Sequence, residues 1–263
     1  MKPEHRTALV TGSTRGIGLG VAKALARAGF DIALHGAQPS AAAEGAQREV
    51  GEAGRPGQGV LFFPCDLEQQ DRVGELVDKV ERELGPIDVL VNNAGIQHVS
   101  PVDQFSDDRW DAVMAVNLSA AFRLIRAALP GMKMRRHGRI VNIASVHGLV
   151  ASANKAAYVA SKHGLIGLTR AVALEVANAG VTCNAICPGW VLTDLVRAQA
   201  EAEAVSRGVD FQHACDGLLA AKQPMKAFSS VDAIGELTAF LCSDAAATMT
   251  GAAVAMDGGW TAV

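Results

Sequence analysis

Short apolar runs alternate with longer helix-like stretches along all 263 residues, and no other feature constrains the fold as much. The apolar runs have the composition of strands that are buried on both faces of a parallel sheet. They predict strands at 8–11, 31–35, 60–65, 89–92, 139–143, 182–186 and 253–256. The intervening stretches predict helices at 16–28, 41–53, 69–84, 107–129, 156–179 and 231–242. This repetition predicts right-handed crossovers and a Rossmann-type α/β fold: a doubly wound, mostly parallel seven-stranded sheet with helices on both faces.

The chain is predicted to form one domain over residues 1–263, because no linker divides it. Residues 192–224 stand out between the last two predicted strands. They contain an Ala/Glu-rich helical run that stops at Arg207-Gly208. Ligands of doubly wound folds bind beyond the carboxyl ends of the strands, so we expect this segment to form a helical substrate lid over the site. A plain pair of surface helices is the alternative interpretation.

Composition excludes several classes of protein. Hydrophobic residues make up 49% of the chain, too many for an intrinsically disordered protein. A net charge of −3 without a basic block predicts no nucleic-acid or membrane partner. No apolar run approaches the ~18–20 residues of a membrane helix, and residues 1–6 lack the features of a secretory leader. Five cysteines without a CxxC pair predict buried thiols, no metal site and a cytoplasmic location.

A glycine-rich loop follows the first predicted strand. Gly12, Gly16 and Gly18 precede a predicted helix in the spacing G-x3-G-x-G. Glycines allow a tight turn here and let the backbone approach a pyrophosphate at the helix N-terminus. Asp66 follows the third strand, where it could accept a hydrogen bond from an adenine, and the small residues of Asn92-Asn93-Ala94-Gly95 follow the fourth. Together these loops predict a dinucleotide site.

Thr11–Gly18 and Asn92–Gly95 resemble the TGxxxGxG and NNAG motifs of the short-chain dehydrogenase/reductase family. The resemblance spans nearly the whole chain and implies a bound nicotinamide dinucleotide. The cofactor-binding residues that we expect are Gly12, Thr14, Arg15, Gly16, Ile17, Gly18, Asp66, Leu67, Asn93, Ala94, Gly95, Tyr158, Lys162, Pro188, Gly189, Val191 and Thr193.

Ser145, Tyr158 and Lys162 are the candidates for catalysis. Tyr158 and Lys162 are four residues apart, so a helix places the phenol and the ammonium on one face. A cation within ~4–6 Å favours the phenolate, and we expect it to lower the tyrosine pKa from about 10. The resemblance implies that Tyr158 exchanges a proton with the alcohol, Ser145 binds the substrate oxygen and Lys162 binds the nicotinamide ribose. It also implies that Asn117 supports Lys162; a polar group at a helix irregularity is the other interpretation of Asn117.

The choice between NAD and NADP depends on two places. The second strand ends in His35-Gly36-Ala37-Gln38. This sequence offers neither an acidic residue for the ribose hydroxyls of NAD nor a basic residue for the 2′-phosphate of NADP. Arg15 in the glycine loop could pair with such a phosphate, but it would lack a second cation. We therefore expect NAD.

Polar and aromatic residues cluster after the catalytic motifs. The residues expected at the mouth of the site are Gln97, His147, Lys155, Trp190, Gln199 and Trp260. A lysine, a histidine and two amides suit a carboxylate in a mostly closed pocket, and two tryptophans would limit the pocket to a short aliphatic body. With Ser145 and Tyr158 fixing the hydroxyl, this set predicts a small 3-hydroxy acid as the substrate. Each residue taken alone also has a plain structural interpretation.

Several segments together are similar to the bacterial D-3-hydroxybutyrate dehydrogenases of the family: Gly95–His98, Ser145–Ala151, Lys155–Tyr158, Cys187–Trp190 and Asp257–Trp260. The similarity implies NAD-dependent, reversible oxidation of (R)-3-hydroxybutyrate to acetoacetate by a homotetramer. Arg15 departs from many relatives, which carry a smaller residue there. One alternative, an NADPH-dependent 3-oxoacyl thioester reductase, suits Arg15. The other is a nucleotide-sensing protein without catalysis, which the complete catalytic set argues against.

Overall fold

The computed structural model describes residues 6–263. The expectation that residues 1–6 lack a secretory leader therefore lies, except for Arg6, outside the described residues. Seven strands form one sheet in the order β3-β2-β1-β4-β5-β6-β7, and every neighbouring pair is parallel. The strands are β1 (Arg6–Val10), β2 (Phe30–Gly36), β3 (Val60–Pro64), β4 (Ile87–Asn92), β5 (Gly138–Ile143), β6 (Val181–Pro188) and β7 (Ala253–Met256). The predicted doubly wound sheet is confirmed, and it is parallel throughout.

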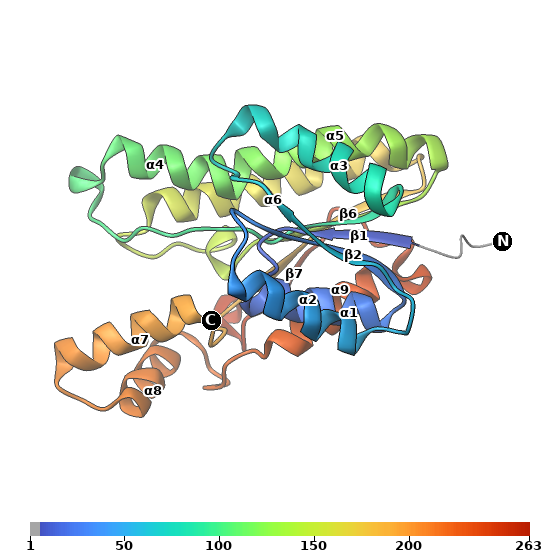
Figure 1. Cartoon of the computed structure of the whole chain (residues 1–263). Helices are drawn as coiled ribbons and strands as arrows, with labels where there is room; N and C mark the ends of the chain where they lie inside the picture. The colour runs from blue at the N-terminus through green and yellow to red at the C-terminus, as the bar shows by residue number, and fades with distance from the viewer. Residues whose placement is uncertain (1–5) are drawn as a thin grey trace.

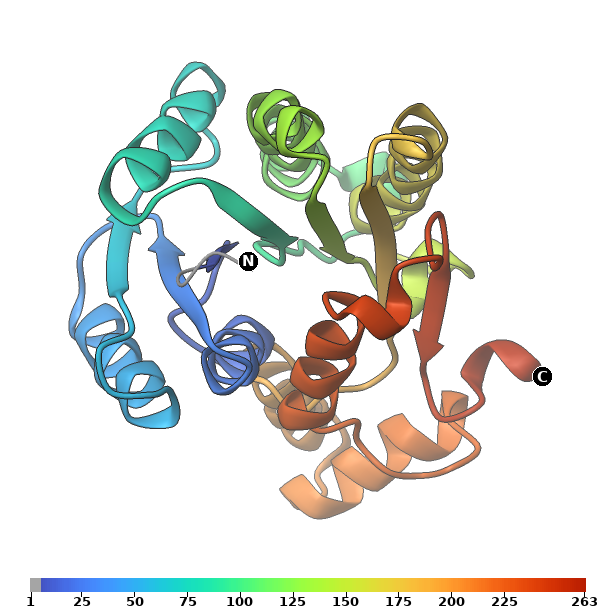
Figure 2. The same ribbon diagram turned by 90° about the vertical axis from the view of Figure 1, so that its right-hand side faces the viewer.

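The sheet lies between two layers of helices (Figure 1), which Figure 2 shows end-on. One face is covered by α1 (Gly16–Arg27), α2 (Ala41–Ala53) and α9 (Val231–Leu241), and the other by α3 (Val73–Leu84), α5 (Ala120–Arg135) and α6 (Ala156–Val176). Successive strand residues point to opposite faces. Ala8 and Val10 therefore join the core beneath α1, while Leu9 joins the core beneath α3 and α5.

One long helix extends past its predicted end at residue 129. It consists of α4 (Asp107–Met114), a π-helical turn (Ala115–Ser119) and α5. Pro130 lies inside α5, where it cannot donate a backbone hydrogen bond. The apolar face nevertheless continues, and Met132 is fully buried against the sheet. Burial of this side chain offsets the missing bond, which is why the prediction of an end at residue 129 is wrong.

The same helix, Asp107–Arg135, is long and apolar enough to cross a membrane by length and composition alone, although the sequence analysis expects no such span. Of its most apolar 18-residue window, 39% is buried inside the protein. Leu124, Ile125 and Ala128 pack into the core between this helix and the sheet. Core helices of globular proteins pass the same test, so part of the apolar composition follows from packing on the sheet.

The segment predicted as a lid forms two helices, α7 (Asp194–Arg207) and α8 (Phe211–Lys222), which project from the body of the protein (Figure 1). α7 ends where the sequence predicts, because Gly208 adopts a left-handed conformation (φ +63°) that favours glycine. We call residues 192–224 the lid. Its closure over a substrate stays a prediction.

Four cysteines are buried thiols, as predicted: Cys183, Cys187, Cys215 and Cys242. Cys65 is only partly buried, so the prediction is wrong for this residue. It follows β3, the strand at the edge of the sheet, where fewer neighbours cover it. Within residues 6–263, no group of three or more His, Cys, Asp or Glu side chains has an arrangement that could hold a metal ion.

Candidate active site

Two loops at the carboxyl edge of the sheet are tied together by Thr11 and Asn93. The Thr11 hydroxyl accepts hydrogen bonds from the backbone N–H groups of Asn93 (3.0 Å) and Ala94 (3.1 Å). The Asn93 side-chain amide donates to the carbonyl oxygens of Thr11 (2.8 Å) and Gly12 (2.9 Å). A Cβ at Gly18 would lie only 2.3 Å from the Gly12 carbonyl oxygen. Asn93 and Gly18, both predicted to bind the cofactor, therefore hold the glycine loop in shape.

The N-terminus of α1 fits a phosphate group. No side chain caps this helix, and its first turn carries no acidic residue. Its first backbone N–H groups and its dipole favour an anion. Gly12 and Gly16 have φ angles of +61° and +55°, and a Cβ at Gly12 would lie 2.9 Å from the backbone of Ala94. The loop is thus shaped by glycines in a way that suits the pyrophosphate of a dinucleotide.

His35, which the sequence analysis did not assign to the site, bridges the glycine loop and β3. Its Nδ1 accepts a hydrogen bond from the Gly12 N–H (3.1 Å), so Nε2 carries the proton and donates to the Cys65 carbonyl oxygen (2.9 Å). Its backbone N–H donates to the Ser13 hydroxyl (2.9 Å). Burial lowers the pKa of His35 to about 4, so the imidazole stays neutral at pH 7 and keeps both bonds.

A cavity of about 630 Å³ lies among these loops and the catalytic residues. The predicted cofactor residues that line it are Gly12, Thr14, Arg15, Gly16, Ile17, Asp66, Leu67, Asn93, Ala94, Gly95, Tyr158, Lys162 and Thr193. Four predicted residues do not line it: Gly18, Pro188, Gly189 and Val191. Residues that line it but were not predicted are His35, Gly36, Ala37, Cys65, Glu68, Ile96, Val116, Ile143, Ala144 and Asp194.

Two of the catalytic candidates, Tyr158 and Lys162, line this cavity, whereas Ser145 and Asn117 lie behind its lining. Tyr158 and Lys162 lie on successive turns of α6, with the lysine Nζ 5.6 Å from the centroid of the phenol ring. The Tyr158 side chain is hydrogen-bonded to Ser145. The Lys162 Nζ donates to the carbonyl oxygen of Ile143 (2.8 Å), at the end of β5. Tyr158 therefore has a hydroxyl and an ammonium beside it, as proton transfer to or from an alcohol requires.

The ionisation of these groups differs from the expectation. Burial raises the pKa of Tyr158, and the hydrogen bond to Ser145 lowers it by less. Burial also lowers the pKa of Lys162 to about 8. The prediction of a lowered tyrosine pKa is therefore wrong for the described structure. The ammonium lies beside the ring and is bonded to a carbonyl oxygen, so desolvation of the phenolate outweighs its attraction.

Asn117 lies in the π-helical turn between α4 and α5 and is buried. Its Oδ1 accepts from the Ile96 N–H (2.8 Å), and its Nδ2 donates to the Ile96 carbonyl oxygen (3.0 Å) and the Ser161 hydroxyl (3.1 Å). Gly95 lies beside both groups, since a Cβ on it would be at contact distance from the Asn117 Oδ1 (3.4 Å) and the Lys162 Nζ (3.6 Å). Asn117 is thus both a polar residue at a helix irregularity and a neighbour of Lys162, so its two interpretations are compatible.

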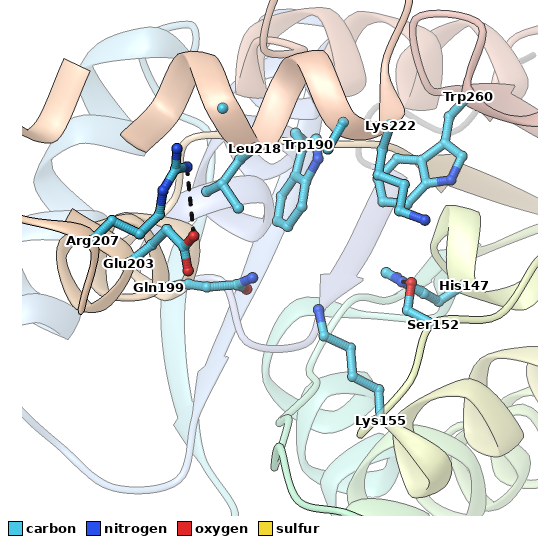
Figure 3. Close-up of a pocket in the computed structure, with 12 residues that line it drawn as sticks. His147, Ser152, Lys155, Trp190, Gln199, Glu203, Arg207, Leu218, Lys222 and Trp260 are labelled. Atoms are coloured by element: carbon cyan, nitrogen blue, oxygen red, sulfur yellow. Dashed lines mark hydrogen bonds and ion pairs between the residues drawn. The ribbon is translucent and has the colours of Figure 1, made fainter. Parts of the chain in front are cut away.

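A second cavity of about 330 Å³ lies between the lid and the catalytic end of the sheet (Figure 3). The predicted substrate residues that line it are His147, Lys155, Trp190, Gln199 and Trp260. The other lining residues were not predicted: Ser152, Glu203, Arg207, Gly217, Leu218, Ala221 and Lys222. Most of these unpredicted residues belong to the lid. The composition of the lid predicts helices, but it does not indicate which side of each helix faces the cavity. Gln97 lines neither cavity, and its role stays a prediction.

His147 connects the second cavity to the catalytic residues. Its ring packs edge-on against Tyr158 (5.9 Å between centroids) and Trp260 (5.4 Å). Its Nε2 lies 2.9 Å from the Ser152 hydroxyl and its Nδ1 lies 3.5 Å from the Ser145 hydroxyl. Burial, helped by nearby positive charges, lowers the pKa of His147 to about 4. The imidazole is therefore neutral at pH 7 and offers hydrogen bonds rather than charge.

Lys155 supplies a buried cation to the same cavity. Its side chain is 8% exposed, and its ammonium lies 5.6 Å from the centroid of the Trp190 ring. Burial lowers the pKa of Lys155. The Trp190 and Trp260 rings lie 5.7 Å apart and form an aromatic wall. A largely desolvated ammonium beside such a wall favours an anionic ligand.

The carboxyl end of the lid is held by Gln223, which the sequence analysis missed. This amide is 2% exposed; its Oε1 accepts from the Trp190 N–H (3.1 Å), and its Nε2 donates to the Ala227 carbonyl oxygen. A Cβ at Gly189 would lie 2.7 Å from the Gln223 Oε1, and one at Gly258 would lie 2.6 Å from its Cγ. Close packing on Gln223 is thus sufficient to explain glycine at 189, a predicted cofactor residue.

Arg15 extends from the glycine loop toward the lid. Its guanidinium lies 3.8 Å from the carboxylate of Asp194, the first residue of α7, and both side chains are exposed. Among the described residues that line the first cavity, the only other lysine or arginine is Lys162.

Comparison with known proteins places this geometry in a family. A model of the short chain dehydrogenases matches residues 6–204. The chain belongs to the short-chain dehydrogenase family. D-beta-hydroxybutyrate dehydrogenase of Cupriavidus necator is 49% identical over 257 residues, which cover 98% of each chain. D-beta-hydroxybutyrate dehydrogenase of Rhizobium meliloti is 46% identical over 257 residues, covering 98% of this chain and 99% of that one.

A solved structure shares the whole architecture. A variant of actinorhodin polyketide ketoreductase with NADPH superposes with a TM-score of 0.90 at 35% identity, covering 97% of each chain. Membership of the family makes this chain an oxidoreductase that uses NAD or NADP. The first cavity, with the uncapped N-terminus of α1 on its wall, is where the residues fit such a dinucleotide.

Proposed function

We propose that the protein oxidises (R)-3-hydroxybutyrate reversibly to acetoacetate with NAD. In the oxidation, the phenolate of Tyr158 takes the proton of the C3 hydroxyl, and Ser145 binds the same oxygen. The residues of the first cavity would hold NAD, which would supply the acceptor for the hydride that leaves C3. Lys162 favours the phenolate through its positive charge. In the reduction, Tyr158 returns its proton to the carbonyl oxygen.

The observation that carries this proposal is the small cavity beside Tyr158. It combines a buried ammonium, Lys155, with the hydrogen-bonding groups of His147 and Gln199, and two tryptophans narrow it. A carboxylate satisfies the ammonium, and a short chain fits between the tryptophan wall and Tyr158. The names of the two relatives at 49% and 46% identity support the same substrate.

NAD is the proposed cofactor because little in the first cavity suits an added phosphate. Gly36 and Ala37, at the end of β2, bring no positive charge. Arg15 lies beside the Asp194 carboxylate, which would compete with a 2′-phosphate for the guanidinium.

An NADPH-dependent 3-oxoacyl thioester reductase is the second candidate, and Arg15 at the first cavity is the observation that favours it. The second cavity argues against it, because an uncharged thioester would leave the Lys155 ammonium without an anion.

The experiment that separates the two candidates is a pair of steady-state assays. One measures kcat/KM for acetoacetate with NADH, and the other measures kcat/KM for acetoacetyl-CoA with NADPH. The proposal predicts that kcat/KM is at least ~100-fold higher for the free acid, because only the acid carries a carboxylate that can pair with the Lys155 ammonium. A preference for the thioester would overturn the proposal.

We also propose that the protein is a homotetramer. Trp110, Phe122 and Leu174 expose apolar side chains on α4, α5 and α6, where helices of a second copy could cover them. Light scattering should give four times the 27.3 kDa of one chain, and a monomer would contradict this.

A further inference from the structure

A second lysine, Lys222, faces the substrate cavity from the end of α8. In Figure 3 its side chain extends toward His147 and Ser152, whereas Lys155 enters the same cavity from the loop before α6. The positive charge of Lys222 also contributes to the lowered pKa of His147. Lys222 therefore lies close to the imidazole ring that packs on Tyr158.

The position of Lys222 is fixed by the residues that follow it. Gln223 is buried and bonded to the Trp190 N–H and the Ala227 carbonyl oxygen. Two residues further, the Met225 N–H donates to the Gly258 carbonyl oxygen (3.0 Å). These bonds join the end of the lid to the loops after β6 and β7. Lys222 thus stands at the end of the lid that these bonds join to the body of the protein.

The charges around the cavity leave two ammonium groups for a ligand. Arg207 lies 3.6 Å from Glu203, so this lining cation already has a lining carboxylate as its partner. Within residues 6–263, neither Lys155 nor Lys222 has a carboxylate within ion-pair distance. His147 is neutral at pH 7. Two lysines without a carboxylate partner in this part of the chain therefore line the cavity: Lys155, which is buried, and Lys222, which is exposed. A carboxylate between them would compensate part of their charge.

We propose that Lys222 binds the carboxylate of the substrate as a second cation, opposite Lys155. This inference rests on the proposed function, because it takes a small carboxylic acid as the substrate. It adds a specificity: two ammonium groups favour an acid over an ester, an amide or a thioester of the same shape, because only the acid carries charge.

The test replaces Lys222 by methionine, which keeps most of the side chain and removes the charge. Lys226→Met is the matched control, because Lys226 is an exposed lysine in the same segment that does not line the cavity. We expect Lys222→Met to raise the KM for 3-hydroxybutyrate about 10-fold, with kcat and the KM for NAD changed by less than about 2-fold. Lys222→Arg should restore most of the affinity, and Lys226→Met should change nothing.

A pair of unreactive ligands separates charge recognition from a structural effect. Butyrate and butyramide have the same shape and differ in charge, and their binding to the enzyme–NADH complex can be measured by NADH fluorescence. Lys222→Met should lower the ratio of the butyrate to the butyramide affinity about 10-fold. A purely structural role would weaken both ligands equally, and that result would overturn the inference.

The inference and the proposed function fail in different ways. If the wild type oxidises 3-hydroxybutyrate and Lys222→Met keeps both its KM and its preference for butyrate, the role of Lys222 is wrong and the function stands. If the wild type prefers butyrate through Lys222 but oxidises no 3-hydroxybutyrate, the carboxylate site stands and the substrate is wrong. If the wild type shows no preference for butyrate, Lys222 does not bind a carboxylate.

Discussion

The cofactor half and the substrate half of the site are held together by different kinds of interaction. In the cofactor half, hydrogen bonds of Thr11, His35 and Asn93 join the loops after β1 and β4 to the end of β2 and to Cys65 after β3, and all six are buried or partly buried. In the substrate half, the exposed contacts of the lid include the ion pair of Arg207 with Glu203 and the hydrogen bond between His213 and Asp210. Gln223 is the buried polar anchor at the lid's carboxyl end.

This difference has an energetic meaning. Breaking a buried hydrogen bond leaves a desolvated group without a partner and costs about 1–3 kcal/mol, whereas exposed ion pairs contribute little. Catalysis and cofactor binding therefore depend on a stiff part of the molecule. The proposed substrate recognition depends in part on the lid, whose Val196 and Leu219 pack on Val146, Trp190 and Trp260 in a small apolar cluster. We expect this segment to open at a lower cost than the loops of the cofactor half. Substitutions in the two halves should consequently have different kinetic signatures.

The largest effect should come from Tyr158→Phe, which keeps the ring and removes the group that exchanges the proton. We expect kcat to fall by a factor on the order of 10³, because general acid–base catalysis contributes that much. The dissociation constant of NADH, measured by fluorescence, should change by less than about 2-fold, since the lining of the cofactor cavity remains. A variant that keeps near-normal kcat would show that Tyr158 is not the acid or base.

Lys155→Met should separate the two halves most clearly. Loss of the buried ammonium should raise the KM for 3-hydroxybutyrate by about 10- to 100-fold, as expected for a charge-assisted hydrogen bond. The KM for NAD should stay within about 2-fold, because Lys155 does not line the cofactor cavity. Lys133→Met, at an exposed lysine of α5, is the control for loss of charge. Equal losses for both substrates would remove Lys155 from the substrate site.

The same substitution at two histidines tests the difference in stiffness directly. His35→Phe leaves the Gly12 N–H and the Cys65 carbonyl without partners. We expect an unfolding free energy lower by about 2 kcal/mol and a KM for NAD higher by about 10-fold. His213→Phe breaks an exposed pair in the lid and should shift neither quantity measurably. Thermal denaturation and NAD kinetics check both, and equal sensitivity at the two sites would refute the comparison.

The smallest effect is a predicted absence of pH dependence. The pKa of His147 is about 4, so the imidazole is already neutral at pH 5.5 and gains no charge between there and pH 7.5. The KM for 3-hydroxybutyrate should therefore be flat across about pH 5.5–7.5. If His147 had the ordinary histidine pKa of 6.5, it would become positively charged as the pH falls through this range. The added charge would attract the carboxylate and lower the KM for 3-hydroxybutyrate. On the alkaline side, the KM should rise earlier than for an ordinary lysine, because burial lowers the pKa of Lys155.

Much of the cofactor half could be predicted from sequence because its signals are local. The glycines of the first loop are close together, and the spacing of Tyr158 and Lys162 is one helical turn. Strands that are buried on both faces are easily recognised as apolar runs, and their predicted ends agree with the structure within two residues. His35 was not predicted as a site residue because its role depends on Gly12 and Cys65, which approach it only in the folded sheet.

The substrate half depends on packing between distant segments, which no local pattern records. Ser152 and Gln223 acquire their partners from other loops, and Lys222 reaches the cavity through the orientation of α8. The pattern of apolar residues also could not show that burial of Met132 allows α5 to continue beyond Pro130. The pKa of Tyr158 follows from burial, a property of the whole fold, and motif spacing could not indicate its direction.

The most direct test of the account is the formation of NADH or NADPH from separate D- and L-3-hydroxybutyrate with NAD and with NADP. The account predicts strong turnover of the D enantiomer with NAD, and little turnover in the other three combinations. Turnover of the D enantiomer with NADP in preference to NAD would make Arg15 a phosphate ligand and contradict the cofactor assignment. Failure of both enantiomers with both cofactors would contradict the proposed substrate.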